Sequence, residues 1–435
     1  MTLAKPHELH AQATRLEAIG GHYDRWVLRS ALLLAALGLV MVTSASMGVA
    51  QALGVHEFHF VQRQMVALLL GGVLAAIAMR VELRFVERQQ RLALLASFVL
   101  LLMVFLPGLG ERVNGAQRWI DLGVLSFQVV EAVKLLLVVW AASYLARHKD
   151  EIGSRWRNLL VPLAVVGAMV LLLIAQPDFG SSALLVAIVL CMSFLAGASW
   201  PRLALLALPG ILGMVALAVF EPYRLARITS FREPFEDPFG SGYQLVQALI
   251  AIGRGEWFGV GLGASVQKLQ AFPEVHTDFI FSVLAEELGF AGVLATLLLF
   301  GVLLWRAFAI GLRCMLLRRQ FAGLVAYGVG LWIGVQATVS IGVNLGLLPT
   351  KGLTLPLISY GGSSLMMTCA AIGLLLRVSY ELDRAERQVQ RARNDLRQFD
   401  GPGETVLPAA LVAAQAAAVR TKPAARIEPV IGGMR

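Results

Sequence analysis

Four polar residues precede a hydrophobic run in the segment PEVHTDFIF at 273–281: Glu274, His276, Thr277 and Asp278. Such a boundary allows two roles for the Asp278 carboxylate. It can interact favourably with the positive end of a helix dipole, while Thr277 caps the same helix. It can instead be a catalytic group. The local sequence leaves both roles open.

Further ionisable residues lie in or beside apolar runs. Glu131 and Lys134 are three residues apart, so they share one face of a helix and can pair. Glu286 and Glu287 lie in another apolar run, and Asp178 lies in the short turn QPDFG. A charge inside a membrane is costly and commonly marks function. The structural alternatives are a neutralised ion pair, a bond between helices and a cap at the turn.

The elements that would hold these residues are hydrophobic. The chain has 435 residues, 57% hydrophobic and 15% charged, and its mean hydropathy is +0.72. Its apolar residues form repeated runs of about 20, the length that crosses ~30 Å of hydrocarbon as a helix. We therefore predict an all-α polytopic membrane protein and not a barrel. The ten predicted spans are 27–48, 62–79, 91–107, 125–146, 158–175, 181–198, 201–220, 279–303, 321–345 and 353–376.

Basic residues gather in alternate loops of this ten-span arrangement. They lie before span 1, after spans 2, 4 and 8, and after span 10, as in Arg25, Arg84, Arg88, Arg91, Arg147, Arg155, Arg313 and Arg377. Positively charged loops face the cytoplasm. Both termini are therefore predicted to be cytoplasmic, and the net charge of +9 reflects topology and not nucleic-acid binding.

Three regions follow from this topology: a cytoplasmic N-terminal tail at 1–26, a ten-helix domain at 27–376 and a cytoplasmic tail at 377–435. One extracytoplasmic loop, at 221–278, is much longer than the others. Long loops in compact proteins tend to be functional. Its residues 243–252 are predicted to form a short helix along the membrane surface.

The cytoplasmic tail has two parts, a charged helix at 379–399 and a Pro- and Ala-rich segment beyond Gly401 that we expect to be disordered.

The predicted topology brings the unusual charges to the outer half of the membrane. Asp278 lies at the outer lip of span 8, and Glu286 follows eight residues later, about 12 Å deeper at 1.5 Å per residue. The other members of this outer group are Glu131, Lys134, Asp178 and Lys351. A cytoplasmic active site would not produce this pattern.

Other motifs carry no function. Ser265 and Lys268 match S-x-x-K, but the accompanying S-D-N is missing and Thr350-Lys351-Gly352 has the wrong order for K-T-G. No P-loop supports ATP-driven transport. The seven His have no zinc-site spacing, and no metal ligands are predicted.

Four stretches occur in order along the chain: NGAQRWI at 114–120, QPDFG at 176–180, PEVHTDFIFSVLAEELG at 273–289 and LPTKGLTLPLISYGGSS at 348–364. Together they resemble the SEDS family of bacterial cell-wall proteins, over about 27–380 with the ten-span topology. The last stretch, and MVTSAS in the first span, are similar to the cell-division type of this family.

This resemblance implies a peptidoglycan glycosyltransferase. Its substrate would be lipid II, a disaccharide-pentapeptide on undecaprenyl diphosphate, polymerised at the outer face of the inner membrane at the division septum. The implied partners are a class B penicillin-binding protein transpeptidase and other divisome membrane proteins, with no nucleic acid. The essential aspartate of the family, in H-T-D-F, matches Asp278.

The implied chemistry needs one carboxylate. Asp278 would act as general base on a sugar hydroxyl, and the diphosphate leaves as a stable anion without an acid. Positive charge at the diphosphate would come from Arg, Lys or a divalent cation such as Mg or Mn; no cofactor is certain. The substrate-binding candidates are Arg118, Glu131, Lys134, Asp178, Lys268, Glu274, His276, Lys351 and Ser363.

Two other functions remain compatible with the sequence. A lipid II flippase would place charged residues along a full path, whereas the inner half of the spans is apolar and no inverted repeat is evident. A non-catalytic divisome scaffold would tolerate replacement of Asp278 by Asn.

Overall fold

The computed structural model describes residues 20–113, 116–121, 126–219, 231, 233–238, 240, 242–266, 275–349 and 352–399. It divides into two compact units, one at 22–382 and one that comprises 1–21 and 383–435. Of the second unit, residues 20–21 and the helical part at 383–399 are described. The candidate site residues Lys268, Glu274 and Lys351, and the tail beyond Gly401, lie outside the described residues.

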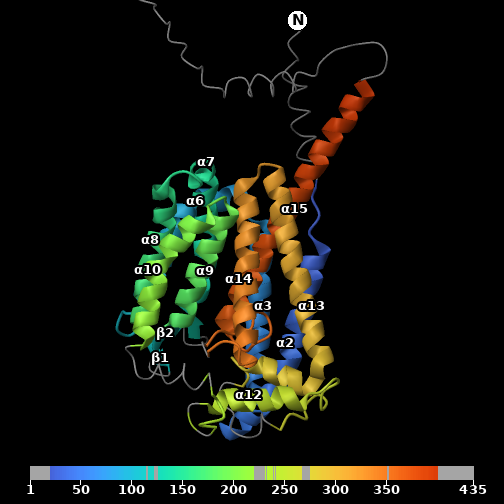
Figure 1. Cartoon of the computed structure of the whole chain (residues 1–435). Helices are drawn as coiled ribbons and strands as arrows, with labels where there is room; N and C mark the ends of the chain where they lie inside the picture. Colours follow the sequence, from blue (N-terminus) through green and yellow to red (C-terminus); the bar gives the residue numbers. More distant parts are fainter. Residues whose placement is uncertain are drawn as a thin grey trace, which may run out of the picture. The chain divides into compact units, whose positions relative to one another are not determined.

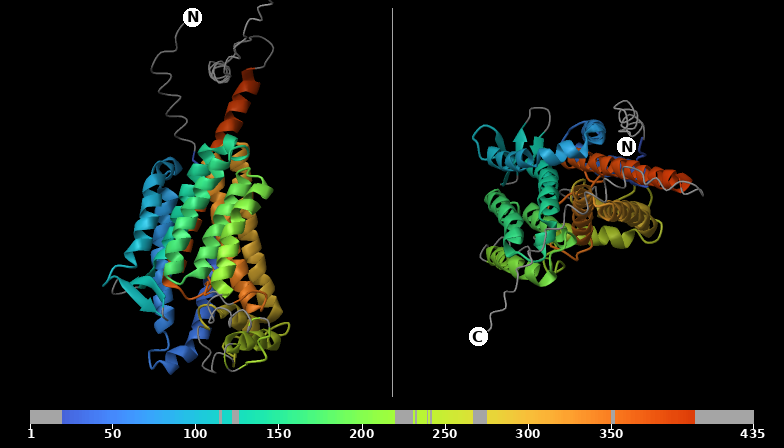
Figure 2. Two further views of the ribbon diagram at one scale, coloured as in Figure 1. Left: turned by 60° about the vertical axis from the view of Figure 1, so that its left-hand side comes forward. Right: turned by 90° about the horizontal axis from the view of Figure 1, so that it is seen from above.

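Every predicted span overlaps a helix. These helices are α2 (Arg25–Ala52), α3 (His59–Arg80), α5 (Gln90–Met103), α6 (Val129–Arg147), α8 (Trp156–Ala175), α9 (Phe179–Leu195), α10 (Trp200–Val219), α13 (Ile280–Leu316), α14 (Gln320–Asn344) and α15 (Gly362–Phe399). With α15 taken up to Leu382, they lie side by side in the main unit (Figures 1 and 2). Three shorter helices are α4 (Leu83–Arg88), α7 (Lys149–Ile152) and α12 (Tyr243–Arg254).

The length and hydropathy of its helices indicate that this is a multi-pass membrane protein. Among the described helices, seven are long and apolar enough to cross a membrane, namely α2, α3, α6, α8, α13, α14 and the first part of α15. The helices α5 and α9 are apolar but shorter. The number of ten crossings and the cytoplasmic termini stay predictions.

The centre of the main unit is built on α6 and α14, which pack against each other. Both are buried on most sides, as expected for helices that are hydrophobic all round. α14 also packs against α9 and α13, and α13 packs against α2. The charged pair of α6 therefore lies in the interior and not at a lipid-facing surface.

A small antiparallel sheet corrects the all-α prediction. It consists of β1 (Gly110–Val113), β2 (Ala116–Asp121) and β3 (Ser126–Gln128), in the order β1-β2-β3. Pairing of Val113 with Ala116 leaves only Asn-Gly between β1 and β2. This dipeptide is the strongest short-range signal for a hairpin. The sequence therefore did contain a signal for the β1-β2 hairpin, which the all-α prediction left out.

The sheet and α12 lie at one end of the helices, and α7 lies at the other (Figures 1 and 2). The short helix predicted at 243–252 is confirmed as α12, and the charged helix predicted at 379–399 is confirmed as the second part of α15.

A break at Gly289 divides α13 into 280–288 and 290–316. Gly289 has φ 64° and ψ −164°, a conformation open to glycine and strained for other residues. The loop after α12 bonds the backbone groups that the break exposes. The carbonyls of Glu286 and Glu287 accept from the N–H groups of Val260 and Gly261 at 2.9 and 3.2 Å.

On the other side of the break, the N–H groups of Phe290 and Ala291 donate to the carbonyls of Glu256 and Trp257, at 2.9 and 3.1 Å. The loop therefore satisfies one helix end and the next helix start, which would otherwise be unpaired. The first part of α13 lies next to α12 (Figure 1). The predicted uninterrupted span 279–303 is therefore wrong, because the helix does not continue through Gly289. Asp278 and Glu286 both precede the break, so the depth of Glu286 stays a prediction.

The predicted start of span 10 is also wrong. Residues 352–361 are not helical, and α15 begins at Gly362. Leu357 has φ 65° and is buried, which is unusual for a leucine. Gly38 of α2 lies against this segment, because an added Cβ would lie 2.4 Å from the Leu357 carbonyl oxygen. Contacts from distant helices thus hold 352–361 in a non-helical path despite its apolar sequence.

Candidate active site

Asp278 lies two residues before the first residue of α13 and is half-buried. The predicted cap at Thr277 or Asp278 is in the wrong place, because Phe279 takes the capping position and makes no side-chain cap. Asn344 of α14 replaces a local cap: its Oδ1 accepts from the Ser282 N–H at 3.1 Å. The start of α13 is therefore anchored by another helix.

Three consecutive backbone carbonyls at Asp278 are held by hydrogen bonds. The Asp278 carbonyl accepts from Asn344 Nδ2 at 2.8 Å, and the Thr277 carbonyl accepts from Ser359 Oγ at 2.6 Å. The His276 carbonyl accepts from the Tyr360 N–H at 2.9 Å. Rigid support of this kind fixes a catalytic side chain in position.

The Asp278 carboxylate faces the segment 352–361. A Cβ added to Gly352 would lie 3.6 Å from Asp278 Oδ2. Gly352 has φ 66° and directly follows Lys351 in the sequence. The two motifs that carry H-T-D-F and T-K-G therefore meet at this carboxylate.

Aromatic rings surround the candidate residue His276. Its ring centroid lies 4.8 Å from that of Phe60 and 5.2 Å from that of Tyr360. Burial raises the pKa of the Tyr360 hydroxyl, and the Arg63 guanidinium opposes that increase. The phenol therefore remains neutral near pH 7, and His276 packs in an aromatic cluster.

Glu131 and Lys134 form the ion pair that their spacing predicted. Lys134 Nζ lies 2.7 Å from Glu131 Oε2, and both side chains are buried. Lys134 also donates to Gln336 Oε1 at 2.8 Å and lies 5.0 Å from the centre of the Trp332 ring. A buried charge needs such partners because its desolvation is costly.

This polar network reaches the segment that faces Asp278. Gln336 Nε2 donates to the Thr354 carbonyl at 2.9 Å, and Thr354 Oγ1 donates to Ser364 Oγ at 3.0 Å. The chain of contacts thus runs from α6 through α14 to 352–361 and α15. Lys134, through Gln336, and Asp278 thus both lie against the segment 352–361.

The candidate residues Arg118 and Asp178 hold the QPDFG turn. Asp178 caps α9 by accepting from the N–H and Oγ of Ser181, at 3.1 and 2.8 Å. Arg118 of β2 donates from Nε to the Gln176 carbonyl at 3.1 Å and from Nη2 to the Pro177 carbonyl. Its Nη1 lies 4.0 Å from Asp178 Oδ1. The cap alternative for Asp178 is confirmed.

Ser363, another substrate-binding candidate, lies at the start of α15 and joins it to the sheet. Its Oγ accepts from the Gln128 N–H at 2.9 Å and donates to the Ser126 carbonyl at 3.3 Å. Ser363 is 2% exposed. In this structure it therefore connects α15 to the region of β3.

The two glutamates of α13 bond different elements. Glu286 accepts from Ser265 Oγ at 2.5 Å and pairs with Arg254 of α12 at 3.2 Å. Glu287 accepts from Ser44 of α2 at 2.6 Å. Both side chains are buried. The structural alternative, a bond between helices, is confirmed for both glutamates.

Sequence reasoning missed the polar residues of α14. Trp332, Gln336, Ser340 and Asn344 recur every fourth residue in an otherwise apolar helix and are all buried. A polar stripe at this spacing predicts one face turned towards polar partners. Among the described residues, no group of three or more His, Cys, Asp or Glu is placed to hold a metal.

Residues 24–384 match a family described as Cell cycle protein and named for FtsW, RodA and SpoVE. The chain belongs to this family. The SEDS membership indicated by the four motifs is thereby confirmed, because the match covers all four of them.

FtsW proteins of other bacteria are similar over most of their length. The probable peptidoglycan glycosyltransferase FtsW of Xanthomonas oryzae pv. oryzae is 57% identical over 381 residues, which are 88% of this chain and 78% of the relative. The protein with the same description from Escherichia coli O6:H1 is 47% identical over 374 residues, 85% of this chain and 90% of the relative.

Solved structures of the FtsW and RodA family share the fold. One chain, from a study of how a peptidoglycan synthase complex coordinates polymerization and crosslinking, has a TM-score of 0.68 and 32% identity. The match covers 83% of this chain and 98% of that one. Thermus thermophilus rod shape determining protein RodA has a TM-score of 0.61 and 33% identity, covering 82% and 96%.

Proposed function

We propose that this protein is a peptidoglycan glycosyltransferase that polymerises lipid II, with Asp278 as the general base. The observation that carries the proposal is the support of Asp278: three consecutive backbone carbonyls are hydrogen-bonded, while its carboxylate faces the conformationally unusual segment 352–361. The FtsW relatives named as probable peptidoglycan glycosyltransferases support the reaction class.

The reaction is a single displacement at the anomeric carbon of the donor sugar. The acceptor hydroxyl oxygen attacks, its proton passes to the Asp278 carboxylate, and the bond to the diphosphate breaks with both electrons on the leaving oxygen. One displacement inverts the anomeric centre. The diphosphate needs cationic groups, and Lys351, Lys268 and Arg118 are the proposed sources.

Lys134 acts indirectly in this proposal. Its ammonium already bonds Glu131 and Gln336, so contact with a diphosphate would require a rearrangement of that pair. A buried pair with two arrangements is a suitable switch element. The remaining candidates, Asp178, Glu274, His276 and Ser363, would position the site.

The proposed topology has ten transmembrane helices in 27–376, cytoplasmic tails at 1–26 and 377–435, and a periplasmic loop at 221–278. The alternating basic loops support it. Asp278 then acts at the outer face of the inner membrane, and the resemblance to cell-division members favours the septum. A class B penicillin-binding protein would crosslink the product, beside other divisome proteins.

The test uses the purified protein with its transpeptidase partner and lipid II, with glycan strands separated on gels. Wild type is expected to form strands, and Asp278→Asn to lower the rate by about 10²-fold or more. Glu57→Gln, an exposed carboxylate between α2 and α3, is the matched control and should retain the rate.

Other outcomes identify the alternatives. Equal strands from wild type and Asp278→Asn would remove Asp278 as the base. No strands from either protein, together with lipid II movement across vesicles, would establish a flippase. Normal division of cells that carry only Asp278→Asn would establish a scaffold.

A further inference from the structure

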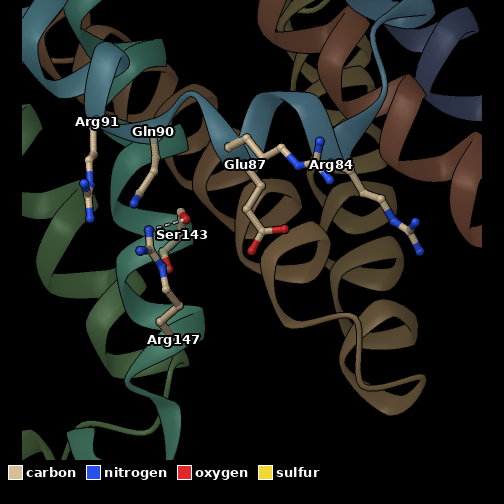
Figure 3. Close-up of a pocket in the computed structure, with 7 residues that line it drawn as sticks. Arg84, Glu87, Gln90, Arg91, Ser143 and Arg147 are labelled. Atoms are coloured by element: carbon tan, nitrogen blue, oxygen red, sulfur yellow. Dashed lines mark hydrogen bonds between the residues drawn. The ribbon is translucent and has the colours of Figure 1, made fainter.

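A positively charged pocket lies between α4, α5 and α6, far along the chain from the Asp278 segment. Its volume is about 620 Å³, and it is lined by Arg84, Glu87, Arg88, Gln90, Arg91, Ser143 and Arg147. Figure 3 shows Gln90 pointing towards Ser143 and Arg147, Arg91 beside Gln90, and Arg84 on the far side of Glu87. Four arginines against one glutamate give the pocket a positive charge, which favours an anion.

The arginines of this pocket differ from other arginines of the basic loops. Arg155 pairs with Glu151, and Arg377 pairs with Glu381. In contrast, the guanidinium groups of Arg84, Arg88 and Arg91 have no hydrogen bond or ion pair with any residue in the described part of the chain. Their donors are therefore available to a ligand.

The floor of the pocket is polar and ordered. Ser143 is fully buried and Gln90 is 8% exposed. Arg147 donates from Nη2 to Ser143 Oγ at 2.9 Å and from Nε to the Ser143 carbonyl at 3.2 Å. These bonds fix the direction of one guanidinium. A planar guanidinium that is held in place can bind two oxygens of a phosphate.

Exposed apolar side chains follow two of the lining arginines in the sequence. Phe85 and Leu92 directly follow Arg84 and Arg91 in the sequence and are 56% and 58% exposed. Exposed apolar side chains beside basic ones suit a ligand that joins a phosphate to hydrocarbon, as at other sites for anionic lipids. A glycerol head group would also offer a hydroxyl to Glu87.

We propose that this pocket binds a phosphate-bearing group, and that its place beside exposed apolar residues of a membrane protein favours the head group of an anionic phospholipid as the source. The site lies in the loops predicted to be cytoplasmic, so it takes lipid from the inner leaflet. It is independent of the glycosyltransferase chemistry, because none of its residues belongs to the Asp278 site. The lipid would tie the ends of α5 and α6 to the bilayer surface.

The test is native mass spectrometry of the full-length protein titrated with phosphatidylglycerol and with phosphatidylcholine of the same acyl chains. Wild type should retain phosphatidylglycerol preferentially. The Arg91→Gln/Arg147→Gln variant should bind it about tenfold more weakly or worse. The matched control, Arg155→Gln/Arg157→Gln, removes the same charge from exposed arginines at the start of α8 and should bind as wild type.

Equal binding by wild type and the pocket variant would overturn the proposal, as would an equal loss in the control. Inorganic phosphate added as a competitor distinguishes the source: displacement of the lipid by equimolar phosphate would assign the site to soluble phosphates, and no displacement to lipid. If the Gln variant does not insert, Arg91→Lys/Arg147→Lys keeps the charge and loses the two-oxygen geometry. This Lys variant should still bind phosphatidylglycerol more weakly than wild type. Unchanged binding would again overturn the proposal.

Discussion

Asn344 joins the end of α14 to the backbone of Asp278. Its Nδ2 donates to the Asp278 carbonyl at 2.8 Å, and its Oδ1 accepts from the N–H of Ser282 in the first turn of α13 at 3.1 Å. One amide side chain thus supplies both the missing helix cap and the support of the proposed base. The position of the Asp278 backbone and the start of α13 therefore both depend on Asn344, which lies 66 positions from Asp278 in the sequence.

Replacement of Asn344 by Ala should lower polymerisation without loss of the fold. The Asp278 carbonyl and the Ser282 N–H would each lose a partner, at a cost of about 1–3 kcal/mol in unfolding free energy. Misplacement of the carboxylate should reduce the rate about 10²-fold, measured on lipid II with the partner present. Thr338→Ala, which removes only an exposed bond within α14, is the control. Equal rates for both variants would contradict the positioning role.

The Glu131–Lys134 pair should be strongly coupled. Either Glu131→Gln or Lys134→Met leaves a buried polar group without its opposite charge, which should destabilise the protein by about 3–5 kcal/mol. The double variant should cost less than the two single changes together. The stabilities of wild type, the two single variants and the double variant form a double-mutant cycle and are measured by thermal unfolding in detergent.

The exposed pair Glu151–Arg155, with an N–O distance of 2.8 Å, provides the comparison for that cycle. Its coupling should be below about 1 kcal/mol because water screens it. A buried pair that proved no stronger than this surface pair would show that Glu131 and Lys134 are hydrated in the folded protein.

Gly289→Ala should be among the most damaging glycine replacements. The new Cβ would lie 2.3 Å from the Gly259 nitrogen and 2.7 Å from backbone atoms of Phe258, at a φ of 64°. Strain and displacement of the loop should cost about 3 kcal/mol or more, measured as a fall in Tm. Gly301→Ala, in the same helix with no atom within 4 Å of its Cβ, should stabilise by about 0.5–1 kcal/mol. Similar Tm values for the two variants would refute the helix break.

The predicted elements were most accurate where a long local pattern decides structure. Runs of apolar residues placed all ten helices, because burial of hydrophobic surface in lipid depends mainly on composition and length. The pairing of Glu131 with Lys134 was predictable as well, since the helix repeat brings residues three apart together. Asp278 was identified by the H-T-D-F motif and not by any local rule.

The sequence by itself therefore determined the helices, the close pairs along each helix and the residue proposed as the base. Only the tertiary structure decided that α13 breaks at Gly289, that the apolar segment 352–361 is not helical, and that Asn344 takes the place of a local cap. Each of these depends on hydrogen bonds or close backbone contacts between residues far apart in the chain. Such partners are chosen by packing of whole helices, which no local period of hydrophobic residues specifies.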